Sequence, residues 1–224
     1  MGIAENLERL RKEIPPEVKI IVVSKTMPVS AIREAYDTGQ RDFGENKAQE
    51  LYNKHEQLPS DMLWHMIGHL QTNKVKLIIP FIHLIHSVDS LKLLSVINAG
   101  AVKTGRTINC LLQIRIAREE TKFGLTYDDA QELLSAGEYL SFRHIRITGL
   151  MGMATFTGDT VQIQQEFSQL AAHFSNIRGK YFPNDPAFSE LSMGMSGDYR
   201  TAIKSGSTMV RIGSLIFGER NYNN

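Results

Sequence analysis

The chain has 224 residues, enough for one well-buried core and too few for two ordinary enzyme domains, so we expect a single domain over residues 1–224. Hydrophobic residues make up 42% of the chain and charged residues 22%, which excludes a disordered or collagen-like protein. Lys and Arg (25) nearly balance Asp and Glu (24), so the chain as a whole has no electrostatic footprint for nucleic acid, and only a local patch would provide one.

The single cysteine, Cys110, excludes internal disulfides and multi-cysteine zinc sites, which favours a reducing compartment. The first 14 residues are charged and amphipathic and lack the apolar stretch of a signal peptide. The longest apolar run, around residues 77–85, contains Pro80 and is too short to cross a bilayer. We therefore expect a soluble, cytoplasmic protein with no membrane partner.

The first segment predicts a helix, because apolar residues recur at helical spacing until a proline pair ends the pattern at positions 15 and 16. The apolar, β-branched run 20–23 then predicts a strand that leads into Lys25. Pro28 stands where a helix opens, and Gly39 stands where a left-handed C-terminal cap belongs. From this point strand and helix patterns alternate along the chain.

Further strands are predicted near residues 42–45, 63–67, 84–88, 110–116, 147–151, 190–193 and 209–217. Helices between them are predicted near 46–57, 72–79, 90–102, 126–136, 160–177 and 198–204. Thr126 and Asp129 have the spacing of an N-terminal capping box. Together with the first strand, this pattern makes eight strands and about as many helices.

Eight such units without a linker or a break in composition predict an α/β fold, a (β/α)8 TIM barrel with an extra N-terminal helix. Continuous apolar runs such as those at 20–23 and 110–114 suit strands that are buried on both faces. A doubly wound open sheet is the alternative. Such a sheet usually has a glycine-rich first turn, whereas the first strand here ends in Ser24-Lys25-Thr26.

In a barrel, residues at the carboxyl ends of the strands face the active site, and Lys25 stands at the first of these ends. Its side chain either turns out to solvent or points into the barrel mouth. In an apolar pocket a lysine amine loses its proton more readily and can form a Schiff base.

The segments 192–198 and 206–214 are rich in Gly and Ser and occupy the seventh and eighth strand ends. Small residues let backbone N–H groups approach an anion, a helix begins near Asp198, and barrels often bind phosphate at these two ends. The alternative to a phosphate-binding site is that the two segments are ordinary glycine turns between strands and helices. A lysine and a phosphate cradle across one mouth fit pyridoxal 5′-phosphate (PLP).

The chain closely resembles the YggS/PROSC family of PLP-binding proteins, the pyridoxal phosphate homeostasis proteins. Eight matching segments follow one another in order and cover nearly the whole chain. They are Val22-Val-Ser-Lys25, Phe43-Gly-Glu-Asn-Lys47, Trp64-His-Met-Ile-Gly-His-Leu-Gln-Thr-Asn-Lys74, His86-Ser-Val-Asp89, Glu120-Thr-Lys-Phe-Gly124, Gly149-Leu-Met151, Leu191-Ser-Met-Gly-Met-Ser196, and Gly206-Ser-Thr-Met-Val-Arg-Ile-Gly213 with Phe217-Gly-Glu-Arg220.

This resemblance implies the fold of the fold-type III PLP proteins, a barrel like the N-terminal domain of alanine racemase. It implies PLP as the cofactor and makes Lys25 the Schiff-base lysine. Arg211 stands where alanine racemase places an arginine against the pyridine nitrogen of the cofactor.

The resemblance also implies that Ser196 contacts the phosphate, that Gly213 and Ser214 form a phosphate-binding backbone turn, and that Asn46 is a pocket residue. The chain departs from the family pattern at two places. Arg115 replaces a common asparagine, which affects the expected outer pocket, and Ser214 replaces a common threonine but keeps the hydroxyl.

His65 and His69 are four residues apart, a spacing that on one helix face would suit a metal. They flank Gly68 at the end of a predicted strand, so we expect pocket or loop-anchoring residues and no metal site. Cys110 opens an apolar run, which predicts a buried small hydrophobe rather than a nucleophile.

We expect a carrier in intracellular PLP homeostasis, which buffers or delivers the cofactor and influences amino- and keto-acid metabolism, rather than an enzyme. PLP racemases of this fold use a second β-domain, for which the barrel leaves no length, and a second base. A weak single-domain racemase or lyase is the first alternative, and an interaction module with a vestigial pocket is the second. The expected ligand is PLP, the candidate partners are amino acids and PLP-dependent apo-enzymes, and the expected state is a monomer or weak dimer.

Overall fold

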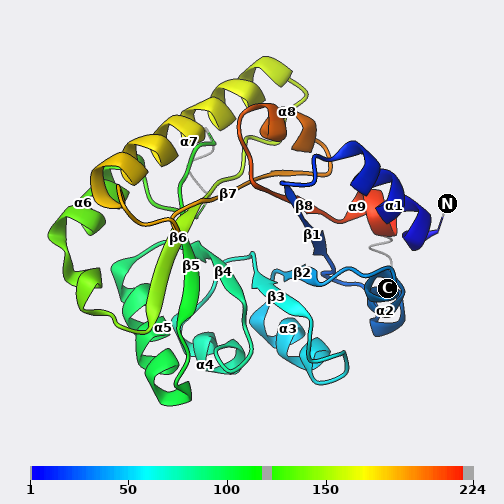
Figure 1. Cartoon of the computed structure of the whole chain (residues 1–224), viewed down its shortest axis with the longest axis horizontal. Helices are drawn as coiled ribbons and strands as arrows, with labels where there is room; N and C mark the ends of the chain where they lie inside the picture. Colours follow the sequence, from blue (N-terminus) through cyan, green and yellow to red (C-terminus); the bar gives the residue numbers. More distant parts are fainter. Residues whose placement is uncertain (1, 118–122, 219–224) are drawn as a thin grey trace.

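The computed structural model describes residues 2–117 and 123–218. Its eight strands are all parallel, follow one another in chain order and close into a barrel, with the last strand paired to the first (Figure 1). A helix follows each strand, and helix α1 (Ile3–Glu13) precedes the first strand. The expected (β/α)8 barrel with an extra N-terminal helix is therefore confirmed, and the open sheet is excluded.

The strands are β1 (Lys19–Val23), β2 (Asp42–Glu45), β3 (Leu63–Met66), β4 (Leu84–Val88), β5 (Ile108–Gln113), β6 (Ile145–Met151), β7 (Glu190–Met195) and β8 (Met209–Ile212). The helices that follow them are α2 (Val29–Asp37), α3 (Ala48–His55), α4 (Val75–Ile78), α5 (Leu91–Thr104), α6 (Tyr127–Ala136), α7 (Thr160–Tyr181), α8 (Tyr199–Lys204) and α9 (Ser214–Phe217). Two short 3-10 helices, Thr72–Lys74 and Glu138–Ser141, complete the list.

The local signals in the sequence have the expected structural consequences. Pro28 is the N-cap of α2, and Gly39 follows that helix with a φ of +89°. At the start of α6, Thr126 accepts a hydrogen bond from the Asp129 N–H, and the Asp129 carboxylate accepts one from the Thr126 N–H. The starts of α2 and α6 could be predicted from the sequence, because helix capping depends on residues that are close in sequence.

The predicted strand over 209–217 is wrong beyond Ile212, because the chain turns into α9 there. Gly213 leaves the extended conformation, and its carbonyl accepts hydrogen bonds from the N–H groups of Ile216 and Phe217. The strand predicted over 110–116 lies instead over 108–113, because the chain leaves the sheet after Gln113. Short apolar runs do not distinguish a strand from a buried helical turn.

Two separate apolar clusters hold the fold together. The larger lies between the outside of the barrel and the surrounding helices. The smaller lies inside the barrel and consists of Ile21, Leu84, Leu111, Met151 and Met209, with Met153 packed against it. The interior is therefore apolar only in part, and buried polar side chains share it. No helix among the described residues is long and apolar enough to cross a bilayer.

Candidate functional site

A cavity of about 750 Å³ lies at the carboxyl ends of the strands. Its lining includes all six residues that the sequence singled out. They are Lys25, Asn46, Ser196, Arg211, Gly213 and Ser214. These residues come from the ends of β1, β2, β7 and β8, so barrel closure brings together positions that are up to 189 residues apart in the sequence. Their individual roles stay predictions.

Apolar side chains line the cavity between its polar groups. Val23, Ile67 and Met153 form walls. Phe123 and Phe156 also line it and are exposed to solvent over 57% and 96% of their surface. Sequence reasoning missed both phenylalanines, because each stands in a loop without a periodic pattern. Phe123 falls in a matching family segment, which was the one available signal.

Lys25 lies two residues beyond β1, is half-buried and lines the cavity. The next residue, Thr26, has a φ of +66°, which makes it the only non-glycine residue with a positive φ in the described part of the chain. Its N–H donates a 2.6 Å hydrogen bond to Glu50 Oε1. A backbone conformation of this kind is costly and persists where neighbouring contacts hold it.

A buried ion cluster lies directly behind this turn. The Lys54 ammonium donates to Glu45 Oε1 at 2.8 Å, to Glu50 Oε1 at 2.7 Å and to the Ser24 carbonyl at 2.7 Å. The Ser24 hydroxyl donates to Glu45 Oε1 at 2.6 Å. Burial raises the pKa of the Glu45 carboxyl, although the Lys54 charge opposes this shift. The cluster therefore anchors both residues that flank Lys25.

Asn46 lies between β2 and α3, outside the helix in which the sequence placed it. Gly68, after β3, packs against its backbone, and a Cβ on Gly68 would lie 2.4 Å from the Asn46 carbonyl oxygen. Only glycine permits this approach without a shift. The second and third strand ends are thus held together beside the cavity.

Arg211 reaches the cavity from inside the barrel and is 4% exposed. Its Nη1 donates to the Ser192 carbonyl and hydroxyl at 2.8 and 2.6 Å, and its Nη2 donates to the Gly152 carbonyl at 3.0 Å. Burial lowers the pKa of Arg211 to about 10, and the Asp198 carboxylate opposes that shift. The guanidinium therefore stays cationic at neutral pH and acts as a donor only.

The loops after β7 and β8 line the cavity beside Lys25, because β8 pairs with β1 in the closed barrel. The expected phosphate side therefore lies next to the lysine rather than across the mouth from it. The Gly213 N–H donates to Ser196 Oγ at 3.3 Å, and the exposed Ser214 begins α9. The helix expected near Asp198 begins at Tyr199 and has six residues. Asp198 stands at its N-cap, where its carboxylate accepts the Met195 N–H. Hydroxyls and turn N–H groups are thus the available anion ligands at this side.

The remaining sequence predictions have mixed outcomes. Among the described residues, no three His, Cys, Asp or Glu side chains are placed so that they could hold a metal ion together. His69 lines the cavity, but His65 is buried in the barrel interior, so its assignment to a pocket or loop is wrong. Cys110 is buried as expected, and burial raises its pKa.

Arg115 is exposed and is not among the residues that line the cavity, whereas Gln113 is. Residues 120–122 and 219–220 of the matching segments lie outside the described residues.

Comparison with known proteins places this barrel in a family. The family model for the alanine racemase N-terminal domain matches residues 2–221. The pyridoxal phosphate homeostasis protein of Escherichia coli K12 is 37% identical, over 98% of this chain and 97% of that protein. The protein of the same name from Aquifex aeolicus is 38% identical, over 91% of this chain and 88% of that one. This chain belongs to the pyridoxal phosphate homeostasis protein family.

Solved structures agree with this assignment. PipY of Synechococcus elongatus without PLP is similar with a TM-score of 0.90 and 36% identity, over 97% of this chain and 100% of that chain. PipY with PLP bound has a TM-score of 0.87 and 35% identity over the same shares. An alanine racemase from Clostridium difficile has a TM-score of 0.77 at 14% identity, over 99% of this chain and 58% of that chain, which shows a shared barrel fold only.

Proposed function

We propose that this protein binds PLP in the cavity at the barrel mouth, attached through Lys25, and acts in cytoplasmic PLP homeostasis by buffering or delivering the cofactor. The observation that carries the proposal is the lining of one cavity by Lys25, Arg211 and the Ser196–Gly213–Ser214 turn. Family membership and the PLP-bound structure of PipY support it. Candidate partners are amino acids and PLP-dependent apo-enzymes, with the protein as a monomer or weak dimer.

The residues present fit this group. Bound PLP supplies an aldehyde that condenses with a lysine amine and releases one water. Lys25 provides the amine, and the apolar walls suit a flat ring. The buried Arg211 guanidinium lines the same cavity and provides N–H donors. Ser196, Ser214 and the Gly213 backbone suit a phosphate.

A carrier fits this lining better than a racemase or a lyase. Among the described residues that line the cavity, Lys25 is the only lysine, and none is a tyrosine. His69 is paired with Asp89 at 3.2 Å and stacked on Phe123, and Asp198 is bonded to the Met195 N–H. No unengaged second base is therefore evident in this lining. Arg211 donates only, so it cannot hold a proton on a ring nitrogen, and this weakens PLP as an electron sink.

The first prediction concerns the phosphate. Pyridoxal, which lacks it, should bind about ten- to a hundredfold more weakly than PLP, because the lost charge-assisted hydrogen bond is worth roughly 1.5–3 kcal/mol. Fluorescence titration of the apo-protein with both vitamers measures the ratio. Ser196→Ala should reduce it, while Ser135→Ala, at an exposed helical serine outside the cavity, should leave it unchanged. Equal affinities for the two vitamers would refute a phosphate site here.

The second prediction separates a carrier from an enzyme. In deuterated buffer, the PLP-loaded protein should exchange the Cα proton of L- and D-amino acids slowly and with retained chirality, because Lys25 acts from one face only. Proton NMR follows the exchange, and chiral chromatography and keto-acid assays follow the products. Racemisation or elimination at roughly 1–1000 per second that disappears in Lys25→Ala would establish the enzyme alternative.

A further inference from the structure

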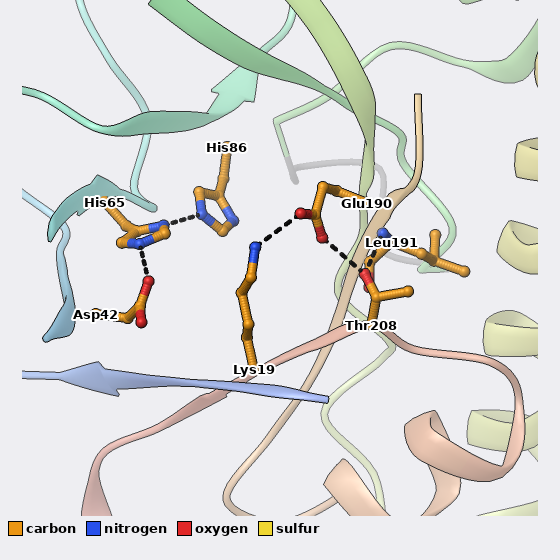
Figure 2. Close-up of polar contacts among 7 residues, drawn as sticks. All are labelled: Lys19, Asp42, His65, His86, Glu190, Leu191 and Thr208. Carbon is orange, nitrogen blue, oxygen red and sulfur yellow. Dashed lines mark hydrogen bonds and ion pairs between the residues drawn. The ribbon is translucent and has the colours of Figure 1, made fainter. Parts of the chain in front are cut away.

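A row of hydrogen-bonded side chains crosses the barrel interior behind the cavity, and we call it the interior column. Its members, in order, are Asp42, His65, His86, Ser192 and Arg211. The successive contacts are Asp42 Oδ1 to His65 Nε2 at 3.0 Å, His65 Nδ1 to His86 Nε2 at 2.9 Å, His86 Nδ1 to Ser192 Oγ at 2.9 Å and Ser192 Oγ to Arg211 Nη1 at 2.6 Å. Figure 2 shows His65 between Asp42 and His86.

The column links the two ends of the barrel. Asp42 is the first residue of β2 and its side chain is 23% exposed, whereas Arg211 lines the cavity at the other end. His65, His86 and Ser192 between them are fully buried. Barrel interiors are usually filled with branched apolar side chains, and burying polar groups is costly unless all of them are paired. The proposed PLP site itself uses only Arg211 of these five residues.

The chemistry of the two end groups sets the direction of the hydrogen bonds. Arg211 can only donate, so Ser192 Oγ accepts at that end. An ionised Asp42 can only accept, so His65 Nε2 carries a proton. Burial would raise the pKa of the Asp42 carboxyl, but the hydrogen bond to His65 and the nearby positive charges outweigh it and hold that pKa below its usual range.

The two inner bonds then have one consistent arrangement for neutral imidazoles. His65 Nδ1 accepts from His86 Nε2–H, and His86 Nδ1 accepts the Ser192 hydroxyl proton. Burial, with the Arg211 charge as a further cause, lowers the pKa of His86 well below its usual value, which keeps this imidazole neutral. Every group therefore donates toward Asp42, and aligned bonds of this kind polarise one another.

Other charged groups at the same end of the barrel are engaged elsewhere. Lys19 pairs with Glu190 at 2.8 Å, and Glu190 accepts from Thr208 Oγ1 at 3.1 Å (Figure 2). The His83 ring lies 5.3 Å from the His65 ring, and burial lowers the pKa of His83. Asp42 is thus the carboxylate at the end of the interior column, where it accepts the hydrogen bond from His65.

We propose that the interior column positions Arg211, so that Asp42 at one end of the barrel holds the guanidinium in place in the cavity at the other. Asp42, His65, His86 and Ser192 are positioning residues, which act on the cofactor through Arg211. The proposal rests on the proposed function, in which Arg211 faces bound PLP. The side-chain geometry of the column itself does not depend on the cofactor.

The first test measures the histidine tautomers in apo-protein that carries ¹⁵N-labelled histidine. Long-range proton–nitrogen correlation spectra should show the Nε2–H tautomer for both His65 and His86. In Ser192→Ala, both histidines should keep this tautomer, because Asp42 still accepts from His65 and His65 Nδ1 still accepts from His86, but the His86 Nδ1 resonance should shift because this nitrogen loses its donor. An Nδ1–H tautomer at either histidine in the wild-type protein would overturn the column.

The second test uses two charge-removing variants at the same end of the barrel. Asp42→Asn should weaken PLP binding about three- to tenfold without a change in melting temperature, because coupling through such networks is typically of this size. Glu190→Gln, which removes a carboxylate that contacts Lys19 and Thr208 rather than the column, should bind PLP as the wild type does. In a Ser192→Ala background, which interrupts the column, Asp42→Asn should have no further effect.

The outcomes separate this proposal from the proposed function. Normal PLP binding by the wild type together with unchanged binding by Asp42→Asn would overturn the column and leave the function intact. An Asp42→Asn effect that persists in the Ser192→Ala background would also overturn it. A wild-type protein that binds no PLP would instead remove the proposed function, and the role of the column with it.

Discussion

Replacement of Lys25 with alanine is expected to abolish covalent attachment of PLP. Lys25 stands at the end of β1 and is the only lysine among the described residues that line the cavity, so no neighbouring amine can take its place there. Borohydride reduction followed by peptide mass mapping should find a pyridoxyl group on Lys25 in the wild type and none in the variant. The visible absorbance of the covalent complex should disappear in parallel.

Lys47→Ala is the matched control for this experiment. Lys47 follows the next strand end along the chain, but its side chain is exposed and does not line the cavity. Its replacement should leave the adduct on Lys25 unchanged. Lys74 also lies outside the cavity lining. A reduced adduct on Lys47 or Lys74 of the wild type would contradict the assignment.

The variant Lys54→Met is expected to be destabilised by about 3–5 kcal/mol, because it leaves a buried carboxylate without its partner. Glu45 is fully buried, and its Oε2 has no hydrogen-bond partner among the described residues, so Lys54 supplies much of the compensation for its charge. Urea unfolding, followed by circular dichroism, measures the loss. A variant within about 1 kcal/mol of the wild type would show that the cluster contributes little.

Two further variants show whether burial of the ion pair is the cause. Lys12 forms an i,i+4 pair with Glu8 at the same 2.7 Å as Lys54 with Glu50, but its side chain is 74% exposed. Lys12→Met should therefore leave the free energy of unfolding nearly unchanged. The double variant Glu45→Gln/Lys54→Met removes both buried charges and should recover most of the lost stability.

The double variant also separates stability from function. It lacks the Lys54 ammonium that donates to the Ser24 carbonyl beside Lys25. Even with stability restored, the turn that carries Lys25 is less firmly held, so we expect slower covalent capture of PLP than in the wild type. Stopped-flow absorbance after mixing with PLP measures that rate. An unchanged rate would show that the cluster contributes to the stability of the fold and not to the capture of PLP.

Sequence reasoning predicted the barrel, the position of Lys25 and the two Gly- and Ser-rich strand ends from local signals, whereas Asn46 and Arg211 were proposed from the family resemblance. Alternating strand and helix patterns at short intervals predict a (β/α)8 fold, and a lysine directly after an apolar strand predicts a side chain at the barrel mouth. Small residues after the last two strands carry a similar signal for an anion. In a barrel these strand ends meet by topology, so correct element order alone is enough to group them.

The tertiary structure alone decided the contacts within the barrel interior. Asp42, His65, His86 and Ser192 come from four strands, and no spacing in the sequence relates them. The direction in which a strand side chain points depends on register and closure, and a shift of one residue would reverse it. His65 was accordingly misassigned to the pocket or a loop. The last apolar run forms strand β8 and then helix α9. Tertiary packing, rather than the local sequence, decides where such a run changes from strand to helix.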